Sequence, residues 1–207
     1  MCYNQIGDNM SKWGIEEKET LNTINEIGLS GNILDVAAGD GRFINELLKL
    51  SQSVTAIDID KEELESLKNN CPKEYSNKLG TEIVDITKTF PYEDESFDGI
   101  FCTGALHLFN KKTIGFIIRE IERCLKENGK IVLDFATDIK RYDKNGKEVL
   151  FEGEVSYSSE DAILLFKELL KDFSLSIQNA SFSENNLDNA GYTSIQGNFL
   201  IISGYKK

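Results

Sequence analysis

The chain alternates between short apolar runs and longer amphipathic segments, a pattern typical of a mainly parallel β-sheet with helical crossovers. Apolar runs bounded by turn residues predict strands, and apolar residues spaced three or four apart predict helices. The predicted strands are residues 32–37, 53–59, 82–85, 97–102 and 130–135. The predicted helices are residues 15–27, 42–50, 61–70 and a fourth that Asn110 caps and that runs to Lys126, before Asn128-Gly129.

The last third of the chain follows a different pattern. Residues 136–159 lack a helical period, and Asn145-Gly146 predicts a hairpin with a primed turn there, over residues 140–152. A helix is expected from Ser159 to Leu170, followed by strands at residues 173–181 and 198–205. Because no helix separates these two strands, they should pair antiparallel. Residues 1–207 are therefore expected to form one three-layer α/β domain, with a seven-stranded, mostly parallel sheet whose last strand is antiparallel.

Composition and charge narrow the range of ligands. Of the 207 residues, 40% are hydrophobic and 28% charged, as in an ordinary globular domain. The net charge of −12 disfavours nucleic acid without a partner subunit and favours a small metabolite, a cationic substrate or a basic protein. No apolar run reaches membrane-spanning length, and residues 1–5 lack the features of a signal peptide, so a cytoplasmic location is expected.

Cysteine and histidine are too few for common metal sites. The four cysteines form no CxxC pair, and His107 is the single histidine of the chain. Neither a structural zinc site nor a cysteine nucleophile paired with histidine is therefore expected. Cys102 and Cys124 lie in apolar patterns typical of small buried hydrophobic residues.

One segment has the composition of a ligand-binding turn. An apolar strand runs through Asp35-Val36-Ala37-Ala38-Gly39-Asp40-Gly41 directly into a helix. Gly39 and Gly41 allow a sharp bend and a close approach to a ligand, and N–H groups at the helix start face the crevice where open α/β sheets bind ligands. A simple tight turn would show the same two glycines, so this segment alone does not decide between the two interpretations.

Asp58 ends the next predicted strand. A carboxylate at this position can accept hydrogen bonds from both hydroxyls of a ribose, which is typical of a nucleoside site. Alternatively, Asp58 caps the helix that starts at Lys61, although Asp60 is closer to that helix. A dinucleotide is disfavoured because Ile44 occupies the place of the third glycine in the dinucleotide fingerprint. Asp40 would also repel a pyrophosphate.

Four segments in order resemble class I methyltransferases that use S-adenosylmethionine (SAM), of the small Rossmann-like, type 11-like kind. Residues 33–43 look like the first motif of this family, and Ala56-Ile57-Asp58-Ile59-Asp60 looks like its acidic second strand. Residues 84–98 are similar to its third segment, in which an aspartate precedes an apolar-Pro turn and a Ser-Phe-Asp strand. Residues 122–130 look like the usual approach to its fifth strand. Four ordered matches are more specific than any single motif.

The resemblance implies a Rossmann-like fold with SAM as cofactor and S-adenosylhomocysteine (SAH) as product. Gly39 and Gly41 would then pass close to the methionine part of SAM. Asp35 would order the loop, and Asp58 would hold the ribose.

The resemblance also implies contacts with the adenine ring. Asp85 would reach the adenine amino group, the Ile86 N–H would donate to a ring nitrogen, and Ile59 would pack on the ring face. Thr103, directly after the fourth strand, is expected beside the cofactor. The chain departs from the commonest family pattern at Ala37-Ala38, where many members have Gly-Cys or Gly-Thr. Ala37 keeps the position small, so SAM binding should be retained.

The acceptor of the methyl group is less well defined. Residues 101–107 lie where the family places substrate-facing residues, and they lack the Asn/Asp-Pro-Pro-aromatic motif of members that methylate exocyclic base or amide nitrogens. His107 is a candidate general base for a hydroxyl, thiol or protonated amine, or else a packing residue. Because SAM is already activated, alignment alone can suffice without a base. Residues 3–13, as a lid, and the hairpin region at residues 138–158 are expected to shape the acceptor pocket.

The sequence thus predicts methyl transfer from SAM to a small-molecule acceptor by in-line displacement. A protein or RNA acceptor delivered with a partner is an alternative. Two others are a SAM-binding regulatory subunit that has lost catalysis and an NAD-dependent Rossmann oxidoreductase, which Asp40 and Ile44 disfavour.

Overall fold

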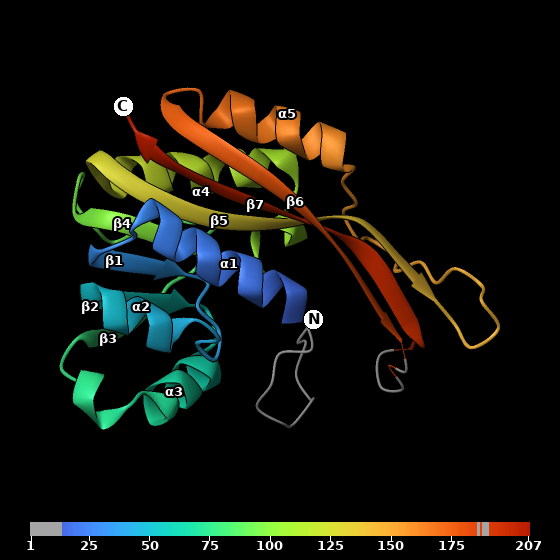
Figure 1. Cartoon of the computed structure of the whole chain (residues 1–207), viewed down its shortest axis with the longest axis horizontal. Coiled ribbons are helices and arrows are strands. Elements are labelled where there is room, and N and C mark those ends of the chain that lie inside the picture. The colour runs from blue at the N-terminus through green and yellow to red at the C-terminus, as the bar shows by residue number, and fades with distance from the viewer. Residues whose placement is uncertain (1–13, 186, 188–190) are drawn as a thin grey trace.

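Seven strands form one sheet between layers of helices (Figure 1). The computed structural model describes residues 14–185, 187 and 191–207, so the lid expected at residues 3–13 lies outside the described residues. The strand order is β3-β2-β1-β4-β5-β7-β6. The strands are β1 (Gly31–Val36), β2 (Ser51–Asp58), β3 (Leu79–Ile83), β4 (Phe97–Cys102), β5 (Leu125–Tyr142), β6 (Phe173–Asn185) and β7 (Ser194–Lys206).

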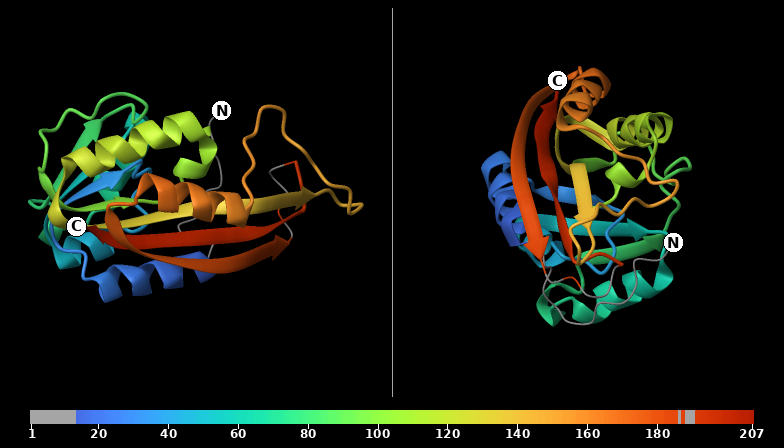
Figure 2. Two further views of the ribbon diagram at one scale, coloured as in Figure 1. Left: turned by 90° about the horizontal axis from the view of Figure 1, so that it is seen from above. Right: turned by 90° about the vertical axis from the view of Figure 1, so that its right-hand side faces the viewer.

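Both faces of the sheet are apolar and are covered by helices (Figure 2). On β1, Ile33 packs in the cluster that includes residues of α1, α2 and α3, whereas its neighbour Leu34 packs with residues of α4 and α5. Burial on both faces is the reason that the central strands are continuous apolar runs. The prediction of a three-layer α/β fold is confirmed. The helices are α1 (Gly14–Ile27), α2 (Ile44–Leu50), α3 (Lys61–Asn70), α4 (Lys111–Cys124) and α5 (Ser159–Leu169), with short 3-10 turns η1 (Lys73–Tyr75) and η2 (Leu106–Leu108).

The last strand runs against its neighbours, as predicted. β7 pairs antiparallel with β5, from Lys130 opposite Tyr205 to Tyr142 opposite Ser194, and antiparallel with β6 along the whole of that strand. The other neighbouring strands pair parallel. No helix in the described part of the chain is long and apolar enough to span a bilayer.

The predicted lengths of β5, β6 and β7 are wrong, because all three strands are longer. They continue beyond the helices as a twisted ribbon (Figure 1). The ribbon has a small core of its own, separate from the two main clusters, formed by Ala136, Phe182, Ile195 and Phe199. Helices cover little of this region, so polar residues alternate with apolar ones and no continuous apolar run marks the strands in the sequence.

Two predicted boundaries are also wrong. β3 begins at Leu79 rather than residue 82, and Leu79 pairs with Val54 of β2. As an edge strand with partly exposed side chains, β3 has little apolar pattern to mark its start. α4 ends at Cys124 rather than Lys126, because the buried Leu125 takes an extended conformation and pairs with Phe97.

The turn predicted at Asn145-Gly146 is present, but it is not a primed turn. Gly146 has a positive φ of 74°, whereas Asn145 does not, and the Gly146 N–H donates to the Asp143 carbonyl. This is the pattern of a type I turn followed by a glycine bulge. The returning arm is short and pairs through Glu148 with Tyr142.

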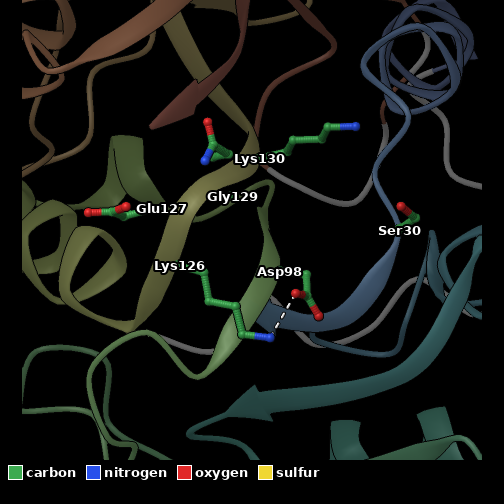
Figure 3. A pocket seen from close by; sticks show the side chains of 7 residues that line it. Ser30, Asp98, Lys126, Glu127, Gly129 and Lys130 are labelled. Carbon is green, nitrogen blue, oxygen red and sulfur yellow. Dashed lines mark hydrogen bonds and ion pairs between the residues drawn. The ribbon is translucent and has the colours of Figure 1, made fainter. Parts of the chain in front are cut away.

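A small hollow lies at the amino ends of β1, β4 and β5 (Figure 3). Three of its charged groups are already engaged: Lys126 Nζ lies 2.7 Å from Asp98 Oδ1, and Lys130 Nζ donates to the Gly28 carbonyl at 2.9 Å. The second oxygen of Asp98 accepts from the Asn32 N–H at 2.8 Å. These bonds tie the starts of the three strands together, at the edge opposite to the predicted ligand turn. The hollow is lined by Ser30, Asp98, Lys126, Glu127, Asn128, Gly129 and Lys130.

A largely buried ion pair fixes the turn after β3 to α4. Glu120 Oε2 accepts from the Phe90 N–H at 2.8 Å and from Arg123 at 2.8 Å. Arg123 also donates to the carbonyls of Phe90 and Tyr92, at 3.1 and 2.7 Å. One arginine therefore satisfies two carbonyls of a turn that has no regular secondary structure and the buried carboxylate of α4.

We expect Arg123→Met to lower the free energy of unfolding by about 2–3 kcal/mol, because Glu120 then stays buried without its cation. Urea denaturation measures the change. The control Arg119→Met removes an exposed cation from the same helix and should change stability by less than about 0.5 kcal/mol. Equal unfolding midpoints for the two variants would contradict the prediction.

Candidate active site

The turn between β1 and α2 has the sharp bends expected of it. Its backbone has positive φ angles at Ala37 (56°), Gly39 (54°) and Gly41 (84°). For an alanine this conformation costs about 1–2 kcal/mol, so Ala37 is a strained position where glycine would be relaxed. The turn is held by the Ala38 N–H, which donates to the Ile57 carbonyl of β2 at 3.0 Å.

The two glycines of the turn are needed for different reasons. A Cβ at Gly41 would lie 2.7 Å from Leu67 Cγ and 3.0 Å from Ile44 Cγ2, so Gly41 permits the packing of α3 on the turn. A Cβ at Gly39 would meet no atom within 4 Å. Gly39 therefore faces open space at the carboxyl ends of the strands, where a ligand can approach its backbone.

Asp58, the last residue of β2, connects two turns. Its Oδ2 accepts from the Gly39 N–H at 2.9 Å and its Oδ1 accepts from the Asp60 N–H at 2.9 Å. The cap of α3 is Asp60, whose side chain accepts from the N–H groups of Glu62 and Glu63. Asp58 is thus not the helix cap, and its carboxylate lies beside the glycine turn.

The segment after β3 lies next to Asp58. The Val84 N–H donates to the Asp58 carbonyl at 2.9 Å, which places Asp85 and Ile86 at the same edge of the sheet. Asp85 Oδ1 accepts from the N–H and the hydroxyl of Thr87, at 2.9 and 2.6 Å, and these bonds lower the pKa of Asp85.

Two predicted adenine contacts differ in their exposure. Ile59, directly after Asp58, has a side chain that is 67% exposed, whereas Ile86 is buried. An apolar side chain left open beside polar turns is a suitable face for a flat ring.

Carboxylates dominate this edge of the sheet. Asp35 is 4% exposed, and its burial together with the nearby Asp58 carboxylate raises the pKa of Asp35 to about 7. Burial and the carboxylates of Asp40, Asp60 and Asp58 raise the pKa of Glu63. Such a field favours a cationic ligand over an anionic one.

A second polar cluster follows β4 and β5. The Gly104 N–H, one residue after Thr103, donates to Asp134 Oδ1 at 2.7 Å. Asp134 Oδ2 and His107 Nδ1 are both buried, and neither has a hydrogen-bond partner among the described residues. Burial lowers the pKa of His107, against an opposing effect of the Asp134 carboxylate. The edge of the His107 ring packs on Phe135, with centroids 6.3 Å apart.

The segment after the hairpin turn is held close to this cluster. Arg141 is 8% exposed and forms a two-pronged ion pair with Glu154, with both N–O distances 2.8 Å. The guanidinium also lies over the rings of Phe151 and Tyr192, at 5.2 and 5.6 Å. Further along, the Tyr157 hydroxyl donates to the Phe109 carbonyl at 2.8 Å.

Cys102 lies between the two clusters. It is fully buried at the end of β4, as its apolar pattern predicts. Burial and the carboxylates of Asp134, Asp35 and Asp58 together raise the pKa of its thiol well above the usual value. The residues predicted for cofactor binding and the His107 cluster are therefore neighbours at one edge of one sheet.

Comparison with known proteins agrees with this geometry. Residues 34–133 match the family model described as a methyltransferase domain. These residues, just under half of the chain, are similar to a methyltransferase domain. The match covers the glycine turn, Asp58, Asp85 and the start of the second cluster. No sequence among the curated proteins matches the chain significantly.

Solved structures share the fold of this chain over most of its length. The YcgJ protein from Bacillus subtilis is 15% identical, with 92% of this chain and 99% of that protein covered at a TM-score of 0.67. The DhpI–SAH complex is 15% identical, with 94% and 88% covered at a TM-score of 0.63. A SAM-dependent methyltransferase from Methanosarcina mazei is 20% identical, with 84% and 91% covered at a TM-score of 0.58. At these identities the likeness shows the fold.

Sequence reasoning missed two features of the second cluster. Asp134 is a single carboxylate inside the apolar run 131–136, and that interruption was the available signal. Arg141 is buried and paired with Glu154, which the mixed charge of the hairpin residues does not predict. No local sequence pattern predicts this ion pair, because Glu154 lies on the other side of the hairpin turn from Arg141.

We expect Gly41→Ala and Gly39→Ala to have different effects, although both place alanine at positive φ. Gly41→Ala should lower the free energy of unfolding by about 2–4 kcal/mol, from backbone strain and the clash with Leu67. Gly39→Ala should cost only about 1–2 kcal/mol, from strain alone. Thermal unfolding monitored by circular dichroism measures both. Equal losses would show that the open space at Gly39 has no structural meaning.

Proposed function

We propose that the chain transfers a methyl group from SAM to a small-molecule acceptor by in-line displacement and releases SAH. The observation that carries the proposal is the contact of Asp58 with the glycine turn. One carboxylate reaches the Gly39 N–H, and the backbone carbonyl of the same residue reaches the segment of Asp85. Groups suited to a ribose, an amino acid chain and an adenine are therefore assembled on three adjacent strands.

The described residues fit an adenosine ligand that carries no phosphate. Asp58 is in position for the ribose hydroxyls, Asp85 Oδ2 remains for the adenine amino group, and the exposed Ile59 suits the ring face. Gly39 leaves room for the methionine part. We assign cofactor contacts also to Asp35, Ala37, Ile86 and Thr103, because they lie at the same carboxyl-end edge of the sheet.

The charge of the site suits SAM in particular. SAM supplies a methyl group on a positively charged sulfur. Asp35 and Asp58 give the edge a negative field, which attracts such a cation and disfavours the pyrophosphate of a dinucleotide.

The acceptor enters, in our proposal, on the side of the second cluster. His107 has a buried ring nitrogen without a partner, and burial keeps its imidazole neutral at pH 7, as a general base requires. Residues 138–158 pack beside it and would shape the pocket.

We expect calorimetry to show binding of SAM and SAH and no comparable binding of NAD. Asp58→Asn should weaken SAM binding by about 10- to 100-fold, the effect of losing charged hydrogen bonds worth about 1.5–3 kcal/mol. The control Asp60→Asn removes a charge two residues away and keeps a good helix cap, so it should change the affinity by less than about threefold. Tighter binding of NAD than of SAM would instead support an oxidoreductase.

SAM binding should strengthen as pH rises from 6 to 8. In the free protein Asp35, with a pKa of about 7, is mainly protonated at pH 6 and mainly ionised at pH 8. Only the ionised form attracts the sulfonium, so affinity rises by at most about tenfold per pH unit below the pKa and levels off above it. SAH shares the titratable groups of SAM and lacks the sulfonium charge, so its affinity should change less. Asp35→Asn should make the two pH profiles parallel, and parallel profiles in the unchanged protein would refute this role.

A further inference from the structure

The second cluster contains two buried polar atoms that the fold leaves without partners. Asp134 is 1% exposed; Gly104 satisfies its Oδ1, and its Oδ2 accepts no hydrogen bond from the described residues. His107 Nδ1 is in the same condition. A buried carboxylate oxygen without a donor is destabilising, because it has lost its hydration and gained no hydrogen bond in return. Such a cost is typical of a site that a ligand completes.

The two atoms belong to one site. His107 lies three residues after Gly104, whose N–H holds Asp134. The Asp134 carboxylate acts electrostatically on His107, as do Arg141 and Glu154. Three segments of the chain therefore lie near the imidazole that η2 carries: the middle of β5, the end of β5 and the segment that returns from the hairpin.

The hydrogen-bonding capacity of the site selects its ligand. An ionised carboxylate only accepts hydrogen bonds, and a neutral imidazole whose proton is on Nε2, the tautomer that a general base at Nδ1 requires, accepts at Nδ1. A hydroxyl or thiol has one hydrogen to donate and cannot serve both groups, whereas an ammonium has three. The ammonium charge also compensates the buried carboxylate.

Among the residues that the structure describes, this cluster contains no free cation for an anionic acceptor. Arg141 is the basic side chain that acts on His107, and both oxygens of Glu154 already pair with it. The carboxylates of Asp35 and Asp58 extend the negative field toward the cofactor side. Next to the imidazole the surroundings are apolar, because the buried ring of Phe135 packs on His107 and also on Tyr157, with centroids 6.3 and 5.0 Å apart.

We propose that Asp134 and His107 bind the protonated amino group of the methyl acceptor, so that the acceptor is an amine and the reaction an N-methylation. Asp134 holds the ammonium, and His107 takes one of its protons, which leaves a lone pair on nitrogen. The nitrogen then forms a bond to the methyl carbon as the bond from that carbon to sulfur breaks. The products are the methylated ammonium, SAH and a protonated His107, which releases its proton to water. This inference rests on the proposed function.

The single histidine allows a direct binding test by NMR. In the full chain labelled with ¹³C and ¹⁵N at histidine, and loaded with SAH at pH 7, every imidazole signal comes from His107. Benzylamine should shift these signals saturably. Benzyl alcohol and benzoate carry the same ring, and each should need at least about tenfold higher concentration, since neither provides both hydrogen bonds and the charge. An equal response to the alcohol or the acid, or no response to benzylamine, would overturn the proposal.

A matched pair of variants assigns the effect to Asp134. Asp134→Asn keeps an oxygen for the Gly104 N–H and removes the charge, so benzylamine should bind at least about tenfold more weakly while SAH affinity stays within about twofold. Asp172→Asn removes an exposed carboxylate near the start of β6, at the opposite edge, and should change neither value. If Asp134→Asn weakens SAH as much as benzylamine, Asp134 serves the cofactor and the proposal is wrong.

A turnover assay distinguishes the amine assignment from the proposed methyltransferase function on which it rests. With SAM and a mixture of primary amines, alcohols, thiols and carboxylates, mass spectrometry should detect N-methyl products, with lower yield from Asp134→Asn. Binding of SAH together with methylation of only oxygen or sulfur acceptors would overturn the amine assignment and leave the methyltransferase intact. Failure of both SAM and SAH to bind would overturn both.

Discussion

The carboxylate of Asp58 is the interaction on which the site depends. It joins the turn after β1 to the turn after β2 through Gly39 and Asp60, and the backbone of the same residue holds the segment after β3. Three turns without regular structure are thus fixed by one residue at the end of a buried strand. Loops positioned by a rigid sheet in this way can bind a ligand without first paying the entropy of their own ordering.

The same arrangement carries an electrostatic cost. Asp35 and Asp58 end neighbouring strands, and Asp134 lies on β5 at the same edge, with Cys102 between them. Burial of like charges side by side destabilises the ligand-free protein, and the raised pKa of Asp35 is its visible consequence. A cationic ligand would relieve this repulsion. The free energy that the repulsion costs the ligand-free protein would then contribute to the affinity for that ligand. Stability and binding are therefore opposed at these positions.

The part of the fold that could be predicted from the sequence is the part buried on both faces. β4 and α3 were placed residue for residue, because each is a clear apolar or amphipathic run bounded by turn residues. β3 was predicted to begin too late and the strands β5–β7 to be too short, because an edge strand and a ribbon with little helix cover carry no continuous apolar run. In the site, local motifs located Gly39 and Asp58. The link between Gly104 and Asp134 spans 30 residues, and only the folded sheet brings them together.

The candidate cofactor side of the sheet, at β1–β3, and the candidate acceptor side, at β5, are built from different kinds of groups. On the side of β1, β2 and β3, the ligand groups are backbone turns and strand-end carboxylates, a geometry that any sequence with this fold reproduces once the glycines and aspartates are present. On the side of β5, the polar groups come from a strand that extends past the helices, from a short 3-10 turn and from a returning segment held by Arg141 and Glu154. Because these contacts are formed by side chains on irregular backbone, they can change without disturbing the sheet. The acceptor must therefore be inferred from this side, where Asp134 and His107 keep the only buried polar atoms of the described second cluster without partners.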